Sequence, residues 1–163
     1  MSKISATSTN WTATAVADAT NQTDAQHHTI QGGSSTQMSR IIDVVVGGLA
    51  SSSAPQILAL ARNSTVGATL SGGRQAALHP SVAALSAPPV SFTTSTTKPQ
   101  RSSTLWLLSL SFNAYGGQIR WIAAPDEEAS LLGNTASLGE VGLSAFTGST
   151  AGAISDTIIF EPL

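Results

Sequence analysis

The sequence contains no cysteine, so it can form neither a disulfide nor a thiolate zinc site. Charged residues make up only 10% of the 163 residues, and the seven Lys and Arg are scattered singly. A nucleic-acid binder normally gathers basic residues on one face, so we expect no direct nucleic-acid partner. No apolar run reaches the length of a signal peptide or a membrane span, so we expect neither secretion nor membrane contact.

Bulky core-forming residues are also scarce. Hydrophobic residues make up 41% of the chain, much of it alanine, and aromatic residues only 5%. The length suits one domain with a real core, but the core must be lean. Small lean domains often gain stability by assembling with copies of themselves, which favours a homo-oligomer.

The richest concentration of apolar volume lies in residues 103–122, STLWLLSLSFNAYGGQIRWI. Alternate residues of its first half are large and apolar, and we expect them to face the core: Trp106, Leu108, Leu110 and Phe112. Asn113, Gly116 and Gly117 tolerate the positive φ of a chain reversal. The stretch therefore predicts two strands joined by a tight turn, with Ile119 and Trp121 on one face of the second strand.

Further strands are predicted by β-branched or alternating runs at residues 39–46, 55–62, 90–97, 140–146 and 154–161. In the first of these, Ile42, Val44 and Val46 form the apolar face and Asp43 points away. Residues 55–62 have a short helix as the alternative, and one helical turn is expected from His79 to Ala87, with Pro80 near its start. The chain as a whole predicts an all-β antiparallel sandwich or barrel of about eight short strands.

Residues 1–36 are small and polar and end near a Gly-Gly-Ser-Ser break. We predict an extended N-terminal arm that orders only against a neighbour, and a sandwich domain over residues 37–163. The alternative is a strand around Trp11, whose neighbours alternate between alanine and threonine.

No residue cluster predicts catalysis, a metal or a cofactor. His27 and His28 are adjacent, and adjacent strand residues point to opposite faces, so they are expected to be polar residues of the arm. The acidic run Asp126–Glu128 lacks the spacing of a calcium loop, and Ser71–Arg74 lacks the flanking strand and helix of a phosphate loop. With three histidines and no Gly-x-Ser-x-Gly motif, a Ser-His-Asp triad has no specific support. We predict that the chain is not an enzyme.

Four stretches resemble virion proteins of tailed bacteriophages: ILALARNSTVG (57–67), LHPSVAALSAPPVSF (78–92), LSLSFNAYGGQIRWIAAPDEEASLLGN (108–134) and LSAFTGSTAGAISDTIIFEPL (143–163). The resembled pattern includes a corner of the form W-(V/I)-A-(A/P)-P-G-E-E, and a final strand that ends in (I/Y)-(F/Y)-E. In this chain the corner is Trp121–Glu128, and Asp126 stands where glycine is frequent.

The resemblance implies a small jelly-roll or β-sandwich component of a virion, often trimeric, made in the host cytoplasm. Such a protein decorates or stabilises a capsid and binds itself and the major capsid protein. The alternatives are a receptor- or carbohydrate-binding virion module and a jelly-roll shell protein, although Lys3 is the only basic residue of residues 1–36. The candidate oligomer or capsid contacts are Trp11, Ile158, Phe160 and Leu163, with core packing as the alternative for the last strand.

Overall fold

The structure, a computed structural model, describes residues 3–79 and 88–163 as an all-β fold with no helix in either range. Residues 80–87 lie outside the described residues, and with them nearly all of the helical turn predicted from His79 to Ala87. The strands are β1 (Ile4–Ala13), β2 (His27–Gln31), β3 (Met38–Gly48), β4 (Pro55–Thr65), β5 (Ser71–Gly72), β6 (Arg74–Ala77), β7 (Val90–Thr94), β8 (Gln100–Asn113), β9 (Gln118–Ile122), β10 (Ala129–Leu132), β11 (Glu140–Ala145) and β12 (Gly152–Pro162).

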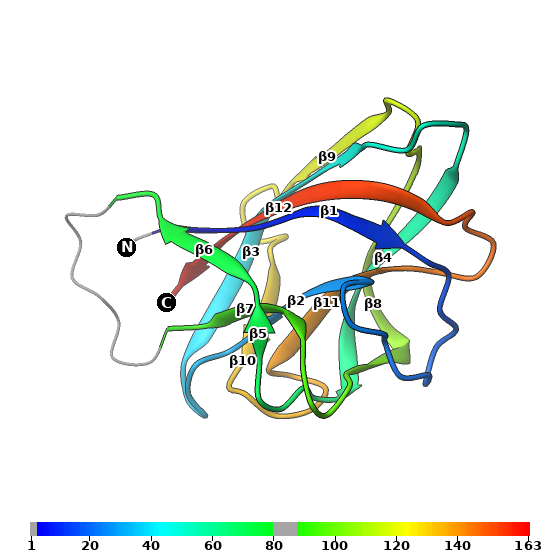
Figure 1. Ribbon diagram of the computed structural model, residues 1–163. Helices are drawn as coiled ribbons and strands as arrows, with labels where there is room; N and C mark the ends of the chain where they lie inside the picture. Colours follow the sequence, from blue (N-terminus) through cyan, green and yellow to red (C-terminus); the bar gives the residue numbers. More distant parts are fainter. Residues whose placement is uncertain (1–2, 80–87) are drawn as a thin grey trace.

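The strands form two antiparallel sheets that pack face to face (Figure 1). Sheet A has the order β10-β3-β12-β1-β6, with β9 also paired to β3, and sheet B has the order β5-β7-β2-β11-β4-β8. Strands β1 and β12 run side by side along sheet A, so both ends of the chain belong to the same layer. The predicted sandwich is therefore confirmed.

Eight principal strands have the topology of a jelly roll. Four neighbours in sheet A are β1, β12, β3 and β9, and four in sheet B are β2, β11, β4 and β8. Along the chain these strands alternate between the sheets, except for the step from β4 to β8 within sheet B, as in two interlocked Greek keys. The other strands lie in insertions: β5, β6 and β7 follow β4, and β10 follows β9.

Residues 103–122 do not form the predicted hairpin. Strand β8 pairs with β4 in sheet B, whereas β9 pairs with β3 in sheet A, so the turn carries the chain between the sheets. The turn is fixed at each end by the neighbour of its strand in the same sheet. Beside β4, Asn113 Oδ1 accepts the Ala54 N–H at 3.0 Å, and at the end of β3 the Gly48 N–H donates to the Gly117 carbonyl at 2.8 Å. The turn-forming residues Asn113, Gly116 and Gly117 therefore predicted the chain reversal correctly, but they did not predict which sheet the returning strand joins.

The inward residues of β3 also differ from the prediction. Ile41, Val44 and Val46 are buried, and a β-bulge opposite Ile159 and Phe160 lies between Ile41 and Asp43. The extra residue of the bulge changes the alternation, which moves Ile42 to the outer face of sheet A. Asp43 faces outward as predicted, and there it binds Arg120 at 2.6 Å.

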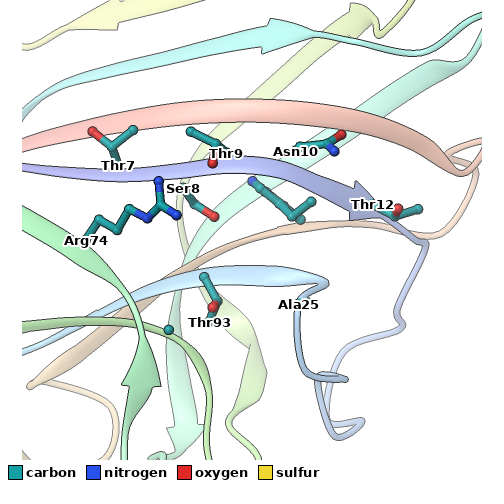
Figure 2. A pocket seen from close by; sticks show the side chains of 10 residues that line it. Thr7, Ser8, Thr9, Asn10, Thr12, Ala25, Arg74 and Thr93 are labelled. Atoms are coloured by element: carbon teal, nitrogen blue, oxygen red, sulfur yellow. The ribbon is translucent and has the colours of Figure 1, made fainter.

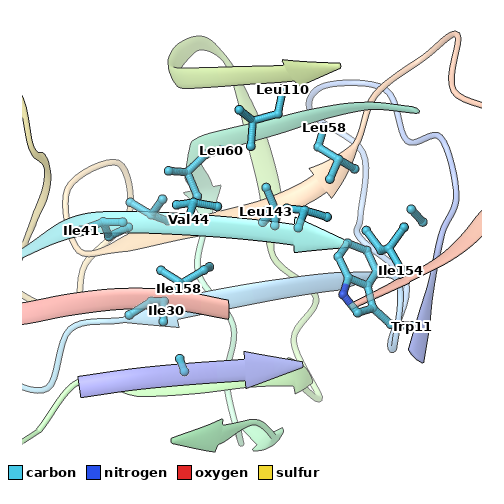
Figure 3. Close-up of a cluster of buried hydrophobic side chains, with 14 of the residues drawn as sticks. Trp11, Ile30, Ile41, Val44, Leu58, Leu60, Leu110, Leu143, Ile154 and Ile158 are labelled. Carbon is cyan, nitrogen blue, oxygen red and sulfur yellow. The ribbon is translucent and has the colours of Figure 1, made fainter. Parts of the chain in front are cut away.

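The core lies between the sheets and draws on nearly every principal strand (Figure 3). Its largest fully buried apolar side chains are Ile30, Ile41, Leu58, Leu60, Leu131, Leu143, Ile154, Ile158 and Phe160. Of the four residues predicted to face inward on β8, Leu110 is buried, whereas Trp106, Leu108 and Phe112 are half-buried. Trp106 packs edge-on against Phe146, with ring centroids 4.7 Å apart.

Residues 1–36 are not an arm but supply β1 and β2. Strand β1 pairs with β12 along its length and with β6 over Ile4–Thr7. Its inward residues Ala6, Trp11 and Ala13 are buried, so one tryptophan and several alanines suffice to anchor a strand that has neighbours on both edges. The strand considered as the alternative around Trp11 is the one that forms.

Substitution of two adjacent glycines of β3 tests how closely the turn between β8 and β9 approaches this strand. A Cβ at Gly48 would lie 2.1 Å from the Ala114 carbonyl oxygen, whereas a Cβ at Gly47 meets nothing within 4 Å. We expect Gly48→Ala to lower the free energy of unfolding by about 2 kcal/mol or more, because the backbone of the turn must shift. Gly47→Ala should be neutral or stabilising by up to about 1 kcal/mol. Urea unfolding measures both, and equal effects would contradict the close approach.

Candidate functional site

A hydrogen-bonded chain of buried polar side chains joins the two sheets. Asp156 in β12 binds His28 in β2, with 2.5 Å between Oδ2 and Nδ1. The other imidazole nitrogen, Nε2, lies 3.0 Å from the hydroxyl of Ser91 in β7. All three side chains are buried. The order carboxylate, imidazole, hydroxyl is that of a Ser-His-Asp triad.

The chain extends at both ends. The Trp11 indole N–H donates to Asp156 Oδ1 at 2.7 Å, so both carboxylate oxygens are occupied. At the other end, Gln75 Oε1 accepts the backbone N–H of Ser91 at 2.9 Å. We call these five residues, Trp11, His28, Gln75, Ser91 and Asp156, the interlayer network. It connects three strands of sheet A with two of sheet B.

The interlayer network has the hydrogen bonds of a Ser-His-Asp triad, but its serine is not accessible to a substrate. A catalytic serine needs space for a substrate carbonyl and donors for the developing oxyanion. Ser91 is only 5% exposed. The backbone of Gly73 lies directly against it, since a Cβ there would be 1.8 Å from the Ser91 carbonyl oxygen and 2.5 Å from Oγ. In this conformation the network stabilises the packing of the sheets and leaves no room for acyl transfer.

Sequence reasoning missed this network and misplaced both histidines. His27 and His28 were predicted as polar residues of an arm, but both are fully buried in β2. His28 is 63 residues from Ser91 and 128 from Asp156, and no local motif links them. The only available signal was the rarity of such residues within apolar strands: Asp156 interrupts the inward-facing series of Ile154, Ile158 and Phe160.

His27 lies on the opposite side of β2 from His28. Its Nδ1 is 2.8 Å from Thr29 Oγ1, and its ring packs edge-on against Phe92. Nε2 has no hydrogen-bond partner among the described residues. Burial lowers the pKa of His27 to about 4, and the neighbouring His28 adds to this effect, whereas Asp24 opposes it.

Two further charged side chains are buried in sheet B, and each ties loops to the sandwich. The Glu140 carboxylate accepts bonds from Asn63 Nδ2 at 2.8 Å, the Gly67 N–H at 3.0 Å and Gln31 Nε2 at 2.7 Å. Burial raises the Glu140 pKa, and these three donors oppose the shift. Arg101 binds Asp18 at 2.7 Å and lies over the rings of Trp106 and Phe146.

Asp126 and Glu127 of the acidic run Asp126–Glu128 are exposed at the surface. Asp126 has a φ of 68°, the left-handed conformation in which glycine is favoured and aspartate is tolerated. Glu128 pairs with Arg40 at 3.3 Å, and Arg40 also binds Glu161 at 2.9 Å. Within residues 3–79 and 88–163, no group of three or more His, Asp or Glu side chains is arranged to hold a metal ion.

The outward side of sheet A carries exposed apolar side chains, and we call it the outer A face. Met38 and Leu132 are paired across β3 and β10, and the Leu163 N–H donates to the Met38 carbonyl, which places all three in one row. They are 41%, 44% and 41% exposed, in that order. Beyond the Arg40 ion pairs, Ile42, Ile122 and Ile159 line a groove of about 560 Å³ on the same face.

The four predicted contact residues occupy different environments. Trp11, Ile158 and Phe160 are buried inside the sandwich, so in this conformation they offer no side chain to another molecule. For the last strand this is the core role considered as the alternative. Only Leu163 lies exposed, on the outer A face.

A second hollow lies between the sheets beside β1. It is a cleft of about 240 Å³ lined by residues 7–12 of β1 and by residues of β5, β6 and β7 (Figure 2). Most of its lining side chains are hydroxyls or amides, and Arg74 contributes the positive charge.

Comparisons of this chain with protein-family models, curated proteins and solved structures found no match. No helix in the described part of the chain is long and apolar enough to span a membrane.

Acid should destabilise the protein through His27. Its folded-state pKa of about 4 lies below the ordinary value of 6.5, so the unfolded chain takes up a proton first as the pH falls. Stability contributed by the neutral imidazole is complete above pH 6.5 and declines between pH 6.5 and 4, by about 3 kcal/mol. His27→Gln should remove this part of the pH dependence in urea unfolding, whereas His79→Gln, at an exposed site, should retain it. Equal slopes for both variants would contradict the assignment.

Asp156→Asn should destabilise the fold strongly. The asparagine amide keeps one acceptor oxygen but turns an NH₂ group toward either the Trp11 N–H or the His28 ring, both of which are buried. We expect a loss of about 2–4 kcal/mol in the free energy of unfolding, measured with urea. Asp126→Asn is the matched control at an exposed position and should change stability by less than about 0.5 kcal/mol. A loss at Asp156 no larger than at Asp126 would refute the role of the network.

Proposed function

We propose that this chain is a structural virion protein that assembles as a homo-oligomer, a trimer, and decorates or stabilises a capsid. The observation that carries the proposal is the outer A face. Isolated exposed hydrophobic residues are normal on soluble proteins. Here three exposed apolar side chains form a row beside a groove that is lined by both apolar and charged side chains, and a contiguous surface of this kind is typical of an interaction site.

The chemistry of the outer A face suits a protein partner. Its apolar side chains surround ion pairs that are already satisfied within the subunit: Arg40 with Glu128 and Glu161, and Arg120 with Asp43. Burying such paired charges against a neighbour costs less than burying isolated ones. Lys3 and Asp126 also line the groove and form no ion pair among the described residues, so a partner must supply groups that bind them. The face is also built on β-strands, which present a fixed set of side chains without ordering a loop.

Two further observations support the virion role. The jelly-roll topology is a common architecture of capsid proteins, although the same fold also serves lectins and enzymes, so this support is an analogy at the level of fold. The resemblance of residues 57–67, 78–92, 108–134 and 143–163 to phage virion proteins supports the same role. The trimer and the capsid partner rest on that resemblance.

Single charges on the outer A face should separate the subunits. We expect the wild-type chain to sediment at micromolar concentration with three times its 16.5 kDa mass, and Met38→Asp and Ile122→Asp to sediment as monomers. The new carboxylate would be buried without a partner at the contact. Ser111→Asp, exposed on β8 of sheet B, is the matched control and should remain trimeric.

Capsid binding distinguishes decoration from other uses of the face. The wild-type protein should co-sediment with preassembled empty capsids of the phage that encodes it, and circular dichroism should show that each variant is folded. A wild-type chain that stays monomeric and does not bind these capsids would contradict the proposal. Assembly of the chain alone into closed shells would favour the shell-protein alternative.

A further inference from the structure

The cleft beside β1 exists because β6 is shorter than the strand it pairs with. β6 covers β1 only from Ile4 to Thr7, where Arg74 is the last partner. From Ser8 to Thr12 the edge of β1 borders the cleft, and Ala25, Gly72 and Thr93 line the opposite wall. Figure 2 shows Arg74 reaching from β6 toward Ser8, with Thr93 across the opening.

The edge of β1 is shaped against pairing with another strand. A β-bulge interrupts its register with β12 between Ser8 and Trp11. Asn10 within it has a φ of 55°, and on the β12 side its N–H donates to the Ser155 hydroxyl at 3.1 Å, so it is the bend of the bulged strand that shapes the opposite edge beside the cleft. Bulges twist an edge away from regular pairing, so an added peptide strand fits poorly here. The cleft is suited to a compact ligand.

The charge of the cleft is positive and uncompensated. Arg74 is exposed and has no carboxylate partner among the described residues, and residues 1–2 and 80–87 contain no Asp or Glu. No carboxylate lines the cleft. A guanidinium binds a carboxylate through two parallel N–H donors, which makes an organic anion the matching ligand.

The remaining lining has the character of a site for a hydroxylated molecule. The side chains of Ser8, Thr9, Thr12 and Thr93 carry hydroxyls, and Asn10 adds an amide. Such groups both donate and accept, as sugar hydroxyls do. The volume of about 240 Å³ falls below the usual range of drug-sized sites and therefore fits a single ring.

We propose that this cleft binds a small hydroxylated carboxylate of the sugar-acid class, with its carboxylate on Arg74 and its hydroxyls on the threonine and serine side chains. Trp11 lines the same cleft, and its indole N–H is held by Asp156. The ligand therefore lies beside a nearly buried ring, 4% exposed, whose orientation is set by the interlayer network, and the Trp11 indole N–H reports binding through this network. This site is independent of the outer A face.

Nuclear magnetic resonance on the full chain tests the proposal with glucuronate as the probe. We expect saturable shifts of the Trp11 indole N–H, assigned by its loss in Trp11→Phe, with a dissociation constant on the order of 1 mM for so small a ligand. Arg74→Gln should weaken binding at least tenfold. Lys3→Gln is the control: it also removes one positive charge, but from the residue just before β1, outside the cleft, and should leave binding unchanged.

Two further probes separate the parts of the ligand. Glucose, which lacks the carboxylate, and inorganic phosphate, which lacks the ring, should each bind at least tenfold more weakly than glucuronate. Absence of saturable shifts with glucuronate, equal affinity in Arg74→Gln, or equal affinity for either probe would overturn the proposal. These outcomes do not depend on the oligomeric state, so they are distinguishable from a failure of the assembly proposal.

Discussion

The buried carboxylate of Asp156 is the constraint on which the arrangement of this sandwich depends. A carboxyl group between two sheets is tolerated only where hydrogen-bond partners surround it, and here the donors Trp11 and His28 lie 2.7 and 2.5 Å from its oxygens. Both donors belong to the first 36 residues. That segment must therefore lie inside the fold, with β1 in one sheet and β2 in the other, despite a composition that is polar enough for an arm.

Strand positions were predictable from the sequence because side-chain alternation is a local property. The runs at residues 39–46, 55–62 and 154–161 all form strands, since their branched and apolar residues repeat with the period of a pleated sheet. Strand partners were not predictable in the same way. The turn at Asn113 predicts a hairpin, yet the sheet that the returning strand joins depends on Ala54, just before β4, and on Gly48 at the end of β3. The bulge beside Ile42 likewise follows from its neighbour β12.

The polar sites were the least predictable part because long-range topology creates them. Ser91, His28 and Asp156 lie on three strands. The jelly-roll order places β2 and β12 in facing sheets, and the pairing of the insertion strand β7 with β2 adds Ser91. The cleft depends on a still finer feature, the point at which β6 ends beside Thr7. In contrast, Leu163 was identified as a contact candidate from its apolar character at the end of a strand, and it lies exposed where Met38 and Leu132 extend its surface.

Some polar side chains lie in the interior of this protein, and some large apolar side chains lie on its surface. Both features have the same physical basis. A core built from many alanines leaves room between the sheets for hydrogen-bonded side chains, which give the layers a specific register. Several of the exposed large apolar residues, including Met38, Ile122 and Leu132, lie on the outward side of sheet A. The cleft opens between the sheets, on the other side of β1. Assembly through the outer A face would therefore leave the cleft accessible, so one subunit can carry both a structural contact and a ligand site.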